Sequence, residues 1–309
     1  MTLASFLGIL FSALSQAAIL ALVTFGIVLI FRTSLTTNFA QGSVGALTAF
    51  FVTMFNSVFL ATHFPGIGPS FSVILAIIAG IIYGFLIGLF VDIILVRNSR
   101  FPNPLSKQMI TMGIVLVITG LIPTIYSGVI DNPPTPQPLT KQIWRLGVGD
   151  GEVVISVHKF LTIVIAIVVI STLFFLLKRT KWGLGVRATA SNETVASMMG
   201  VNTRFITAMS WAIAAAIGSL AAALYAPTIQ TLSVNFMVFM QVNGFLSAVL
   251  GGFTTFIGPV VGAVLIPVMT VFLSRVAGIW NIAIAYFIIL LIVLIKPAGL
   301  FGRRTAKKV

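Results

Sequence analysis

The sequence contains no cysteine and very few charged residues. Of its 309 residues, 7% are charged and 59% are hydrophobic, whereas soluble domains carry roughly 25% charged residues. The lack of cysteine excludes disulfide bonds, thiolate chemistry and cysteine-ligated metals. The polar surface is too small to cover a soluble fold of this size, and the high hydrophobicity excludes intrinsic disorder. The composition therefore predicts an all-α polytopic membrane protein.

The groups that enzymes use are also scarce. The two histidines, His63 and His158, lie far apart in the sequence without companions at ligand spacing, so no metal site is expected. No Ser/His/Asp set, paired carboxylate or phosphate-binding loop is recognisable. We therefore expect a transport function, without catalysis and without a cofactor.

The net charge of +13 does not predict nucleic-acid binding. The basic residues are spread over short loops between apolar blocks and do not form one patch. Basic charge in such loops is typical of the residues that set membrane topology.

Long apolar runs divide the chain into about nine predicted membrane segments within a single transmembrane domain, residues 1–309. Most runs approach the roughly 20 residues that a spanning helix needs. The first run lacks a basic leader and is expected to be a retained span and not a cleaved signal. The short run 236–252 is typical of a re-entrant or discontinuous helix. The segments are 9–31, 39–61, 70–96, 107–127, 160–177, 205–226, 236–252, 256–274 and 278–295.

Basic residues gather in loops on one side of these segments. Most of the 18 lysines and arginines fall at Arg32, in the loops 97–107 and 178–204, and in the tail 296–308. Because positively charged loops stay in the cytoplasm, we expect the N-terminus outside the cell and the C-terminus inside. Asp92 lies one turn from the inner side and is expected to act as an anchor by pairing with Arg97 or Arg100.

The outer loop, residues 128–159, contains a proline-rich stretch at 131–138 that predicts a stiff, extended segment. The stretches 144–148 and 153–155 are expected to pair as a short hairpin. Two interpretations remain open for this loop: a surface for a partner outside the membrane, or a connector.

The inner loop, residues 178–204, contains a predicted short amphipathic helix. Ser191 or Asn192 can cap its start, and Gly200 can end it. Such a helix either lies on the lipid surface or docks onto a cytoplasmic partner. Its apolar face at helical spacing comprises Val195, Met198 and Met199.

Neutral polar residues and glycines interrupt two apolar segments, one in each half of the chain. This pattern predicts discontinuous helices around a central pathway and hints at an internal repeat, although the glycines equally fit close helix packing. Amides are favoured as pathway residues because burying them in lipid is unfavourable. The expected pathway residues are Asn38, Gln41, Gly42, Ser43, Gln241, Asn243, Gly251 and Gly252.

Four motifs, spread over almost the whole chain, occur in an order typical of one transporter family. The motifs are Asn38-Phe39-Ala40-Gln41-Gly42, the stretch 183–202 with Gly200-Val201-Asn202, Leu250-Gly251-Gly252-Phe253 with Gly258-Pro259, and Lys296-Pro297-Ala298-Gly299-Leu300-Phe301-Gly302-Arg303.

By these motifs the chain resembles the permease subunits of ABC importers for branched-chain amino acids, of the H type. The resemblance implies a heterodimer with a second permease of the M type, two cytoplasmic ATPases that bind the ATP, and an external solute-binding protein that delivers a hydrophobic amino acid. The implied location is the cell membrane of a prokaryote. The inner helix is then the coupling helix, with coupling residues at Arg187, Asn192, Glu193, Val195, Ala196, Met198, Met199, Gly200 and Asn202.

The chain departs from the family pattern at two positions. Gln41 stands where a histidine is often found, and Glu193 falls one residue before the acid of the importer coupling motif. Related permeases move urea or short amides, which is the alternative substrate class. A stand-alone secondary transporter or channel is another alternative, but it needs buried acids or a charged ring, and Asp92 alone does not supply one.

Overall fold

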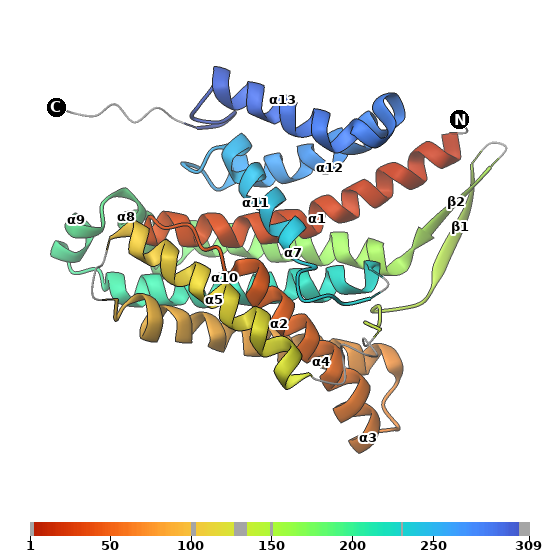
Figure 1. Ribbon diagram of the computed structural model, residues 1–309, viewed down its shortest axis with the longest axis horizontal. Coiled ribbons are helices and arrows are strands. Elements are labelled where there is room, and N and C mark those ends of the chain that lie inside the picture. The colour runs from red at the N-terminus through yellow and green to blue at the C-terminus, as the bar shows by residue number, and fades with distance from the viewer. Residues whose placement is uncertain (1–2, 100–102, 127–134, 149–150, 230, 303–309) are drawn as a thin grey trace.

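The computed structural model describes residues 3–99, 103–126, 135–148, 151–229 and 231–302 (Figure 1). Long helices dominate it, which confirms the predicted all-α membrane fold. The helices are α1 (Leu3–Ser34), α2 (Gln41–Met54), α3 (Ala61–His63), α4 (Pro69–Phe90), α5 (Pro104–Ile125), α7 (Val157–Arg179), α8 (Lys181–Ser191), α9 (Glu193–Met198), α10 (Thr203–Tyr225), α11 (Val238–Gly251), α12 (Ile257–Ala277) and α13 (Asn281–Ile295).

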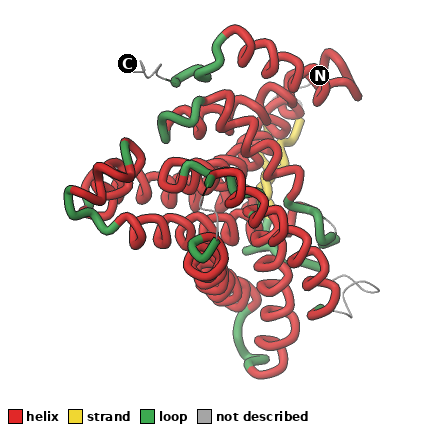
Figure 2. Tube along the Cα trace, turned by 60° about the vertical axis from the view of Figure 1, so that its left-hand side comes forward, coloured by secondary structure: helices red, strands yellow, loops and turns green. Residues whose placement is uncertain are grey.

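Shorter elements connect or extend these helices. Two π-helical segments, η1 (Phe55–Leu60) and η2 (Val91–Val96), continue α2 and α4. Two 3-10 turns, η3 (Ala226–Thr228) and η4 (Gly278–Trp280), follow α10 and α12. Strands β1 (Ile143–Val148) and β2 (Gly151–Ser156) form one peripheral ribbon, shown in yellow in Figure 2.

Seven helical stretches among the described residues are long and apolar enough to cross a membrane. This number differs from the nine predicted segments for two reasons. The last stretch, residues 257–295, contains both α12 and α13, which are joined through η4 with Gly278 at φ +53°. The segment 236–252 contains the helix α11, whose 14 residues are fewer than a full crossing needs, so the prediction of a short element here is confirmed.

Helices α1 and α10 form the core of the molecule. In their most apolar 18-residue windows 78% and 72% of the residues are buried, against 11% for the stretch 257–295. The sequence of α10 is rich in alanine, with glycine and serine among its buried residues. Small side chains let helix backbones approach closely, which is how helices associate where lipid removes the hydrophobic driving force.

Helix α4 packs against α10 through glycines spaced four residues apart. A side chain at Gly88 would lie 2.6 Å from the carbonyl oxygen of Trp211 and 2.8 Å from Cα of Ala212, and one at Gly84 would overlap Ser219. Both glycines are buried on the face of α4 that meets α10. Close backbone packing therefore joins α4 and α10 into one unit.

The hairpin and the α8–α9 region lie at opposite ends of the molecule (Figure 1). The start of α1 lies beside the hairpin, where a side chain at Gly8 would be 3.9 Å from Val153. The predicted hairpin is confirmed, with Trp144 opposite Ile155. Part of the predicted proline-rich segment, residues 131–134, lies outside the described residues.

His158 attaches the outer loop to the helices. Its Nδ1 accepts a hydrogen bond from the backbone N–H of Leu139 at 3.2 Å, and its Nε2 lies 3.1 Å from the carbonyl oxygen of Leu224 in α10. The imidazole is buried and thus serves as a structural link between the loop, α7 and α10.

Candidate coupling surface and solute site

Helix α9 is short and has a capping residue at each end. The side chain of Asn192 accepts a hydrogen bond from the backbone N–H of Val195 at 3.0 Å, which makes Asn192 the cap among the two predicted candidates. Gly200 ends the helix with φ +84°, a left-handed conformation that glycine adopts without strain. Asn202 then caps α10 through the N–H of Phe205 at 3.1 Å. Both ends of α9 are thereby fixed.

The apolar side chains of α9 point away from the protein. Met198 is 79% exposed, Met199 is 81% exposed and Val195 is 53% exposed. Ala196, in contrast, is buried and seats the helix on the rest of the chain. The three exposed side chains, here called the α9 knob, form an apolar surface that no other described residue covers.

The sequence pattern does not predict helix α8. The hydroxyl of Thr180 caps it by accepting from the N–H of Gly183 at 3.1 Å. Arg187 Nη1 donates to the carbonyl of Leu177 in the last turn of α7, and a side chain at Gly185 would lie 2.6 Å from Ile206 of α10. α8 therefore ties α7 to α10, and Arg187 lies within this link and not on the α9 knob.

An ion pair fixes the segment that follows α4 beside the start of α10. Arg97 Nη2 donates to Asp92 Oδ2 at 2.7 Å and to the carbonyl of Arg204 at 2.8 Å. This confirms Asp92 as an anchor, while Arg100 lies outside the described residues. Glu193, the first residue of α9, lines a hollow of about 190 Å³ together with these groups and Lys107.

The amides Asn38, Gln41 and Gln241, here called the amide cluster, join α2, α10 and α11. Gln41 Nε2 donates to a backbone carbonyl of α10 at 2.7 Å, and its Oε1 accepts from Asn38 Nδ2 at 3.3 Å. The side chain of Gln241 bonds twice to the region around the start of α2. Its Oε1 accepts from the N–H of Gly42 at 2.6 Å, and its Nε2 donates to the carbonyl of Phe39.

These bonds leave the amide cluster enclosed by protein. Asn38, Gln41 and Gln241 are all buried, and each bonds to a group from a different part of the chain or to its neighbour in the cluster. Ser43 is half-buried in the first turn of α2. Since buried amides are stable only when hydrogen-bonded, the cluster fixes the relative position of three helices.

Gly251 and Gly252 lie at the junction of α11 and α12. Gly252 has φ +94°, and a side chain there would lie 2.6 Å from the carbonyl oxygen of Ala298. The chain after α13 pairs with this junction, because the N–H of Leu300 donates to the carbonyl of Leu250 at 2.8 Å. Gly252 therefore lets the C-terminal turn pack against the end of α11, and Gly251 lets the start of α12 approach at Gly258.

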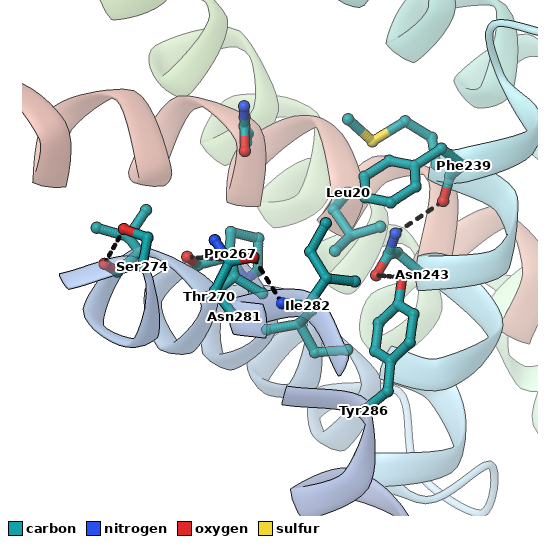
Figure 3. Close-up of a pocket in the computed structure, with 13 residues that line it drawn as sticks. Leu20, Phe239, Asn243, Pro267, Thr270, Ser274, Asn281, Ile282 and Tyr286 are labelled. Carbon is teal, nitrogen blue, oxygen red and sulfur yellow. Dashed lines mark hydrogen bonds between the residues drawn. The ribbon is translucent and has the colours of Figure 1, made fainter. Parts of the chain in front are cut away.

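A cavity of about 330 Å³ lies between α1, α11, α12 and α13 (Figure 3). Asn243 is the one predicted pathway residue that lines it. Tyr286 Oη donates to Asn243 Oδ1 at 3.2 Å, and Asn243 Nδ2 donates to the carbonyl of Phe239 at 2.9 Å. Tyr286 is not among the predicted pathway residues, although its phenol is the one polar side chain after Asn281 in helix α13.

The long apolar helices and the buried core define a polytopic membrane protein. The family described as the branched-chain amino acid transport system permease component matches residues 9–295, so the chain belongs to that family. It is accordingly a transport subunit of an ABC importer and not an enzyme, and it functions with partner subunits.

Several curated proteins are similar in sequence. A permease protein of a high-affinity branched-chain amino acid transport system, BraD of Pseudomonas aeruginosa, is 28% identical over 158 residues, about half of each chain (51% and 52%). The probable branched-chain amino acid permease LivH of Methanocaldococcus jannaschii is 24% identical, covering 95% of this chain and 92% of its own. LivH of Salmonella typhimurium is 22% identical over 98% of both chains.

One solved structure is similar over most of the chain. It is PsaBC from Streptococcus pneumoniae in complex with Fab, with a TM-score of 0.46 and 12% sequence identity, covering 92% of this chain and 88% of that chain.

Proposed function

We propose that this chain is the membrane-spanning subunit of an ATP-driven importer for branched-chain and other hydrophobic amino acids. The α9 knob is the observation that carries the proposal. A helix capped at both ends holds two methionines almost fully exposed, while Ala196 anchors it to the protein. Covering that apolar surface with a partner is favourable by about 25 cal/mol per Å².

The partner at the α9 knob is a cytoplasmic ATPase, one of two in the complex. This chain has no phosphate-binding loop in its sequence, so ATP binds the ATPases. A second permease of the M type completes the pathway as a heterodimer, and an external solute-binding protein delivers the substrate. Family membership supports partner subunits in general, and the M-type permease and the binding protein are what the resemblance of the sequence motifs implies.

The α8–α9 end faces the cytoplasm and the hairpin end faces outward. Four arginines lie at the α8–α9 end, as their contacts with Thr254, Asp92 and the last turn of α7 indicate. They are Arg32, Arg97, Arg187 and Arg204. Basic residues near membrane helices stay on the cytoplasmic side. The start of α1, beside the hairpin, is then outside the cell.

Motion at the α9 knob reaches the membrane helices through α10, which is joined to α4 in two ways. α9 continues directly into α10 through the cap residue Asn202, and α10 is packed closely on α4 at Gly84 and Gly88. Arg97 adds a bond from the inner end of α4 to the first turn of α10. Packed helices move as rigid bodies, so α4 and α10 shift together when α9 is displaced.

Among the predicted pathway residues, Asn243 is the one we assign to solute contact, because it lines the cavity. The hydrogen bonds of the amide cluster fix the positions of α2, α10 and α11 relative to one another. Gly251 and Gly252 keep the inner junction compact.

The experiment that tests the proposal is uptake by vesicles holding the complete complex. Vesicles are prepared with this chain, the second permease, the ATPases and the binding protein, and labelled leucine, isoleucine, urea and acetamide are supplied outside. We expect accumulation of leucine and isoleucine that requires ATP. Preferential uptake of urea or acetamide, or accumulation without the ATPases, would contradict the proposal.

A further inference from the structure

We infer that the cavity between α1, α11, α12 and α13 is where this chain holds the solute during transport, and that it takes a small solute with an uncharged side chain. The inference rests on the proposed function and adds a site and a selectivity rule. Of the 13 residues that line the cavity, none is a lysine, arginine, aspartate, glutamate or histidine. The remaining polar groups are amides and hydroxyls.

By chemistry the lining contains an apolar wall and a set of hydrogen-bonding groups, and the labelled polar residues lie at both ends of the cavity, Asn243 and Tyr286 at one and Ser274 at the other (Figure 3). The wall comes from Leu20 of α1, Met240 of α11 and Ile266 of α12. The polar groups include Asn243 and Tyr286, which are bonded to each other at 3.2 Å. A solute with an apolar side chain and a polar head fits this division, and the volume of about 330 Å³ lies at the lower end of the range for small-molecule sites.

The depth of the cavity suits a solute delivered from outside. It extends from Ser274 and Asn281, which flank the turn between α12 and α13, to Pro267 in the middle of α12. That turn lies toward the hairpin end of the molecule (Figure 1). Lipid tails cannot hydrogen-bond to the amides and hydroxyls of the lining, so water or a polar solute is the fitting content.

The chemistry of the lining sets the selectivity. The ammonium and carboxylate of an amino acid partly offset each other, whereas a charged side chain adds a net charge that would have to lose its hydration without meeting an opposite charge, which is strongly unfavourable. A solute without net charge meets only uncharged hydrogen-bonding groups in this cavity, so no ion pair with the protein holds it there. Weak binding lets the solute leave on the far side.

Tyr286 and Asn243 are the specificity-determining residues of this site. Asn243 Nδ2 bonds to the carbonyl of Phe239, which orients the amide, and the phenol of Tyr286 completes the pair. Loss of the phenol hydroxyl removes one neutral hydrogen bond to the pair or to the solute. We expect Tyr286→Phe to raise the KM for leucine uptake about three- to tenfold.

The test uses the natural lack of cysteine in this chain. Thr270, which lines the cavity and is half-buried, is replaced by cysteine in the complete complex and exposed to a charged, water-soluble methanethiosulfonate reagent. We expect labelling that slows roughly tenfold when leucine is present at about ten times its KM, because about a tenth of the sites then stay empty. Lysine at the same concentration should leave the rate unchanged.

Ser70→Cys is the matched control, because Ser70 is exposed at the start of α4 and does not line this cavity. Its labelling should not respond to leucine. Ser274→Cys replaces Thr270→Cys if the latter fails to assemble. Labelling that leucine does not slow, labelling by a membrane-permeant reagent alone, or equal protection by lysine would overturn the site.

The two proposals fail in different ways. If the unmodified complex takes up leucine with ATP but leucine protects neither cysteine and Tyr286→Phe keeps the KM of the parent, the cavity assignment is wrong and the proposed function stands. If the unmodified complex takes up no hydrophobic amino acid, the proposed function is wrong.

Discussion

The α9 knob and the amide cluster differ in how their side chains are accommodated. The methionines of the α9 knob are unfavourable in water, and the amides of the amide cluster are unfavourable in lipid. At α9, the methionines are almost fully exposed and find no partner within the described part of the chain. In the amide cluster, residues about 200 positions apart satisfy each other, as in the bond from Gly42 N–H to Gln241. We propose that another protein covers the first region, whereas the hydrogen bonds of the second are made within this chain.

The amide cluster belongs to the framework that holds the helices together, and the α9 knob is the proposed docking surface. Substitutions in the framework should lower the free energy of unfolding, and substitutions on the α9 knob should leave it unchanged while they weaken partner binding. The largest loss in the free energy of unfolding is expected where helix backbones pack most closely, and the smallest where a substitution affects a single turn.

Gly88→Leu should have the largest effect on stability. The new side chain would meet the backbone of Trp211 and Ala212 at less than 3 Å, and backbone atoms cannot move aside without separating α4 from α10. We expect a loss of about 3 kcal/mol in the free energy of unfolding measured in detergent. Gly113→Leu is the control, because Gly113 on α5 faces open space. Equal stability of the two variants would contradict the close packing of α4 on α10.

Gln241→Leu should have the next largest effect. The change leaves the N–H of Gly42 and the carbonyl of Phe39 without their partner in a buried site. The expected loss is about 2 kcal/mol, again measured as the free energy of unfolding. Val242→Leu, at the exposed neighbouring position, should cost almost nothing. A stable Gln241→Leu with impaired leucine uptake would instead place this amide in the pathway.

Arg97→Met should destabilise the protein more than Asp92→Asn does. The first change leaves a buried carboxylate without its cation, whereas the second removes the charge and keeps a hydrogen-bonding group. Because Arg97 is partly exposed to solvent, the loss should be moderate, about 1 to 2 kcal/mol. Adding Asp92→Asn to Arg97→Met should recover part of the loss. A double variant as unstable as the sum of the single variants would show that the ion pair does not couple the two residues.

Gly200→Ala should have the smallest effect on stability. Alanine at φ +84° is strained by about 1 kcal/mol, and the strain falls on the end of α9 alone. We expect increased hydrogen exchange in 193–199 with little change in global unfolding. Gly66→Ala is the control, since Gly66 lies in open space without a positive φ. Unchanged exchange in α9 would mean that Gly200 does not hold the end of the helix.

The same contrast explains what can be predicted from the sequence. α9 is defined by signals within ten residues, namely the cap at Asn192, the apolar spacing and Gly200, so it is predictable. The membrane segments and the hairpin also follow from local patterns. Helix α8 is not predicted, because it contains Gly183 and Gly185. These glycines let α8 lie close to α7 and α10, which only the tertiary structure reveals.

The interior site is less predictable for a related reason. The cavity needs four helices from both ends of the chain, and its polar pair joins Asn243 to Tyr286 across 43 positions. The sequence shows which amides lie in apolar segments but not whether each bonds to protein or faces a space. Asn243 and Gln241 are two residues apart and face the cavity and the amide cluster respectively.

The account depends most directly on the α9 knob as the point where ATPase motion enters this chain. The decisive measurement compares Met198→Asp with Met198→Leu in the complete complex, for ATPase co-purification, ATP-dependent leucine uptake and unfolding. We predict that Met198→Asp loses ATPase association and uptake, that Met198→Leu retains both, and that the free energy of unfolding stays within about 0.5 kcal/mol of the parent in each. Retention of ATPase association and uptake by Met198→Asp would contradict the account.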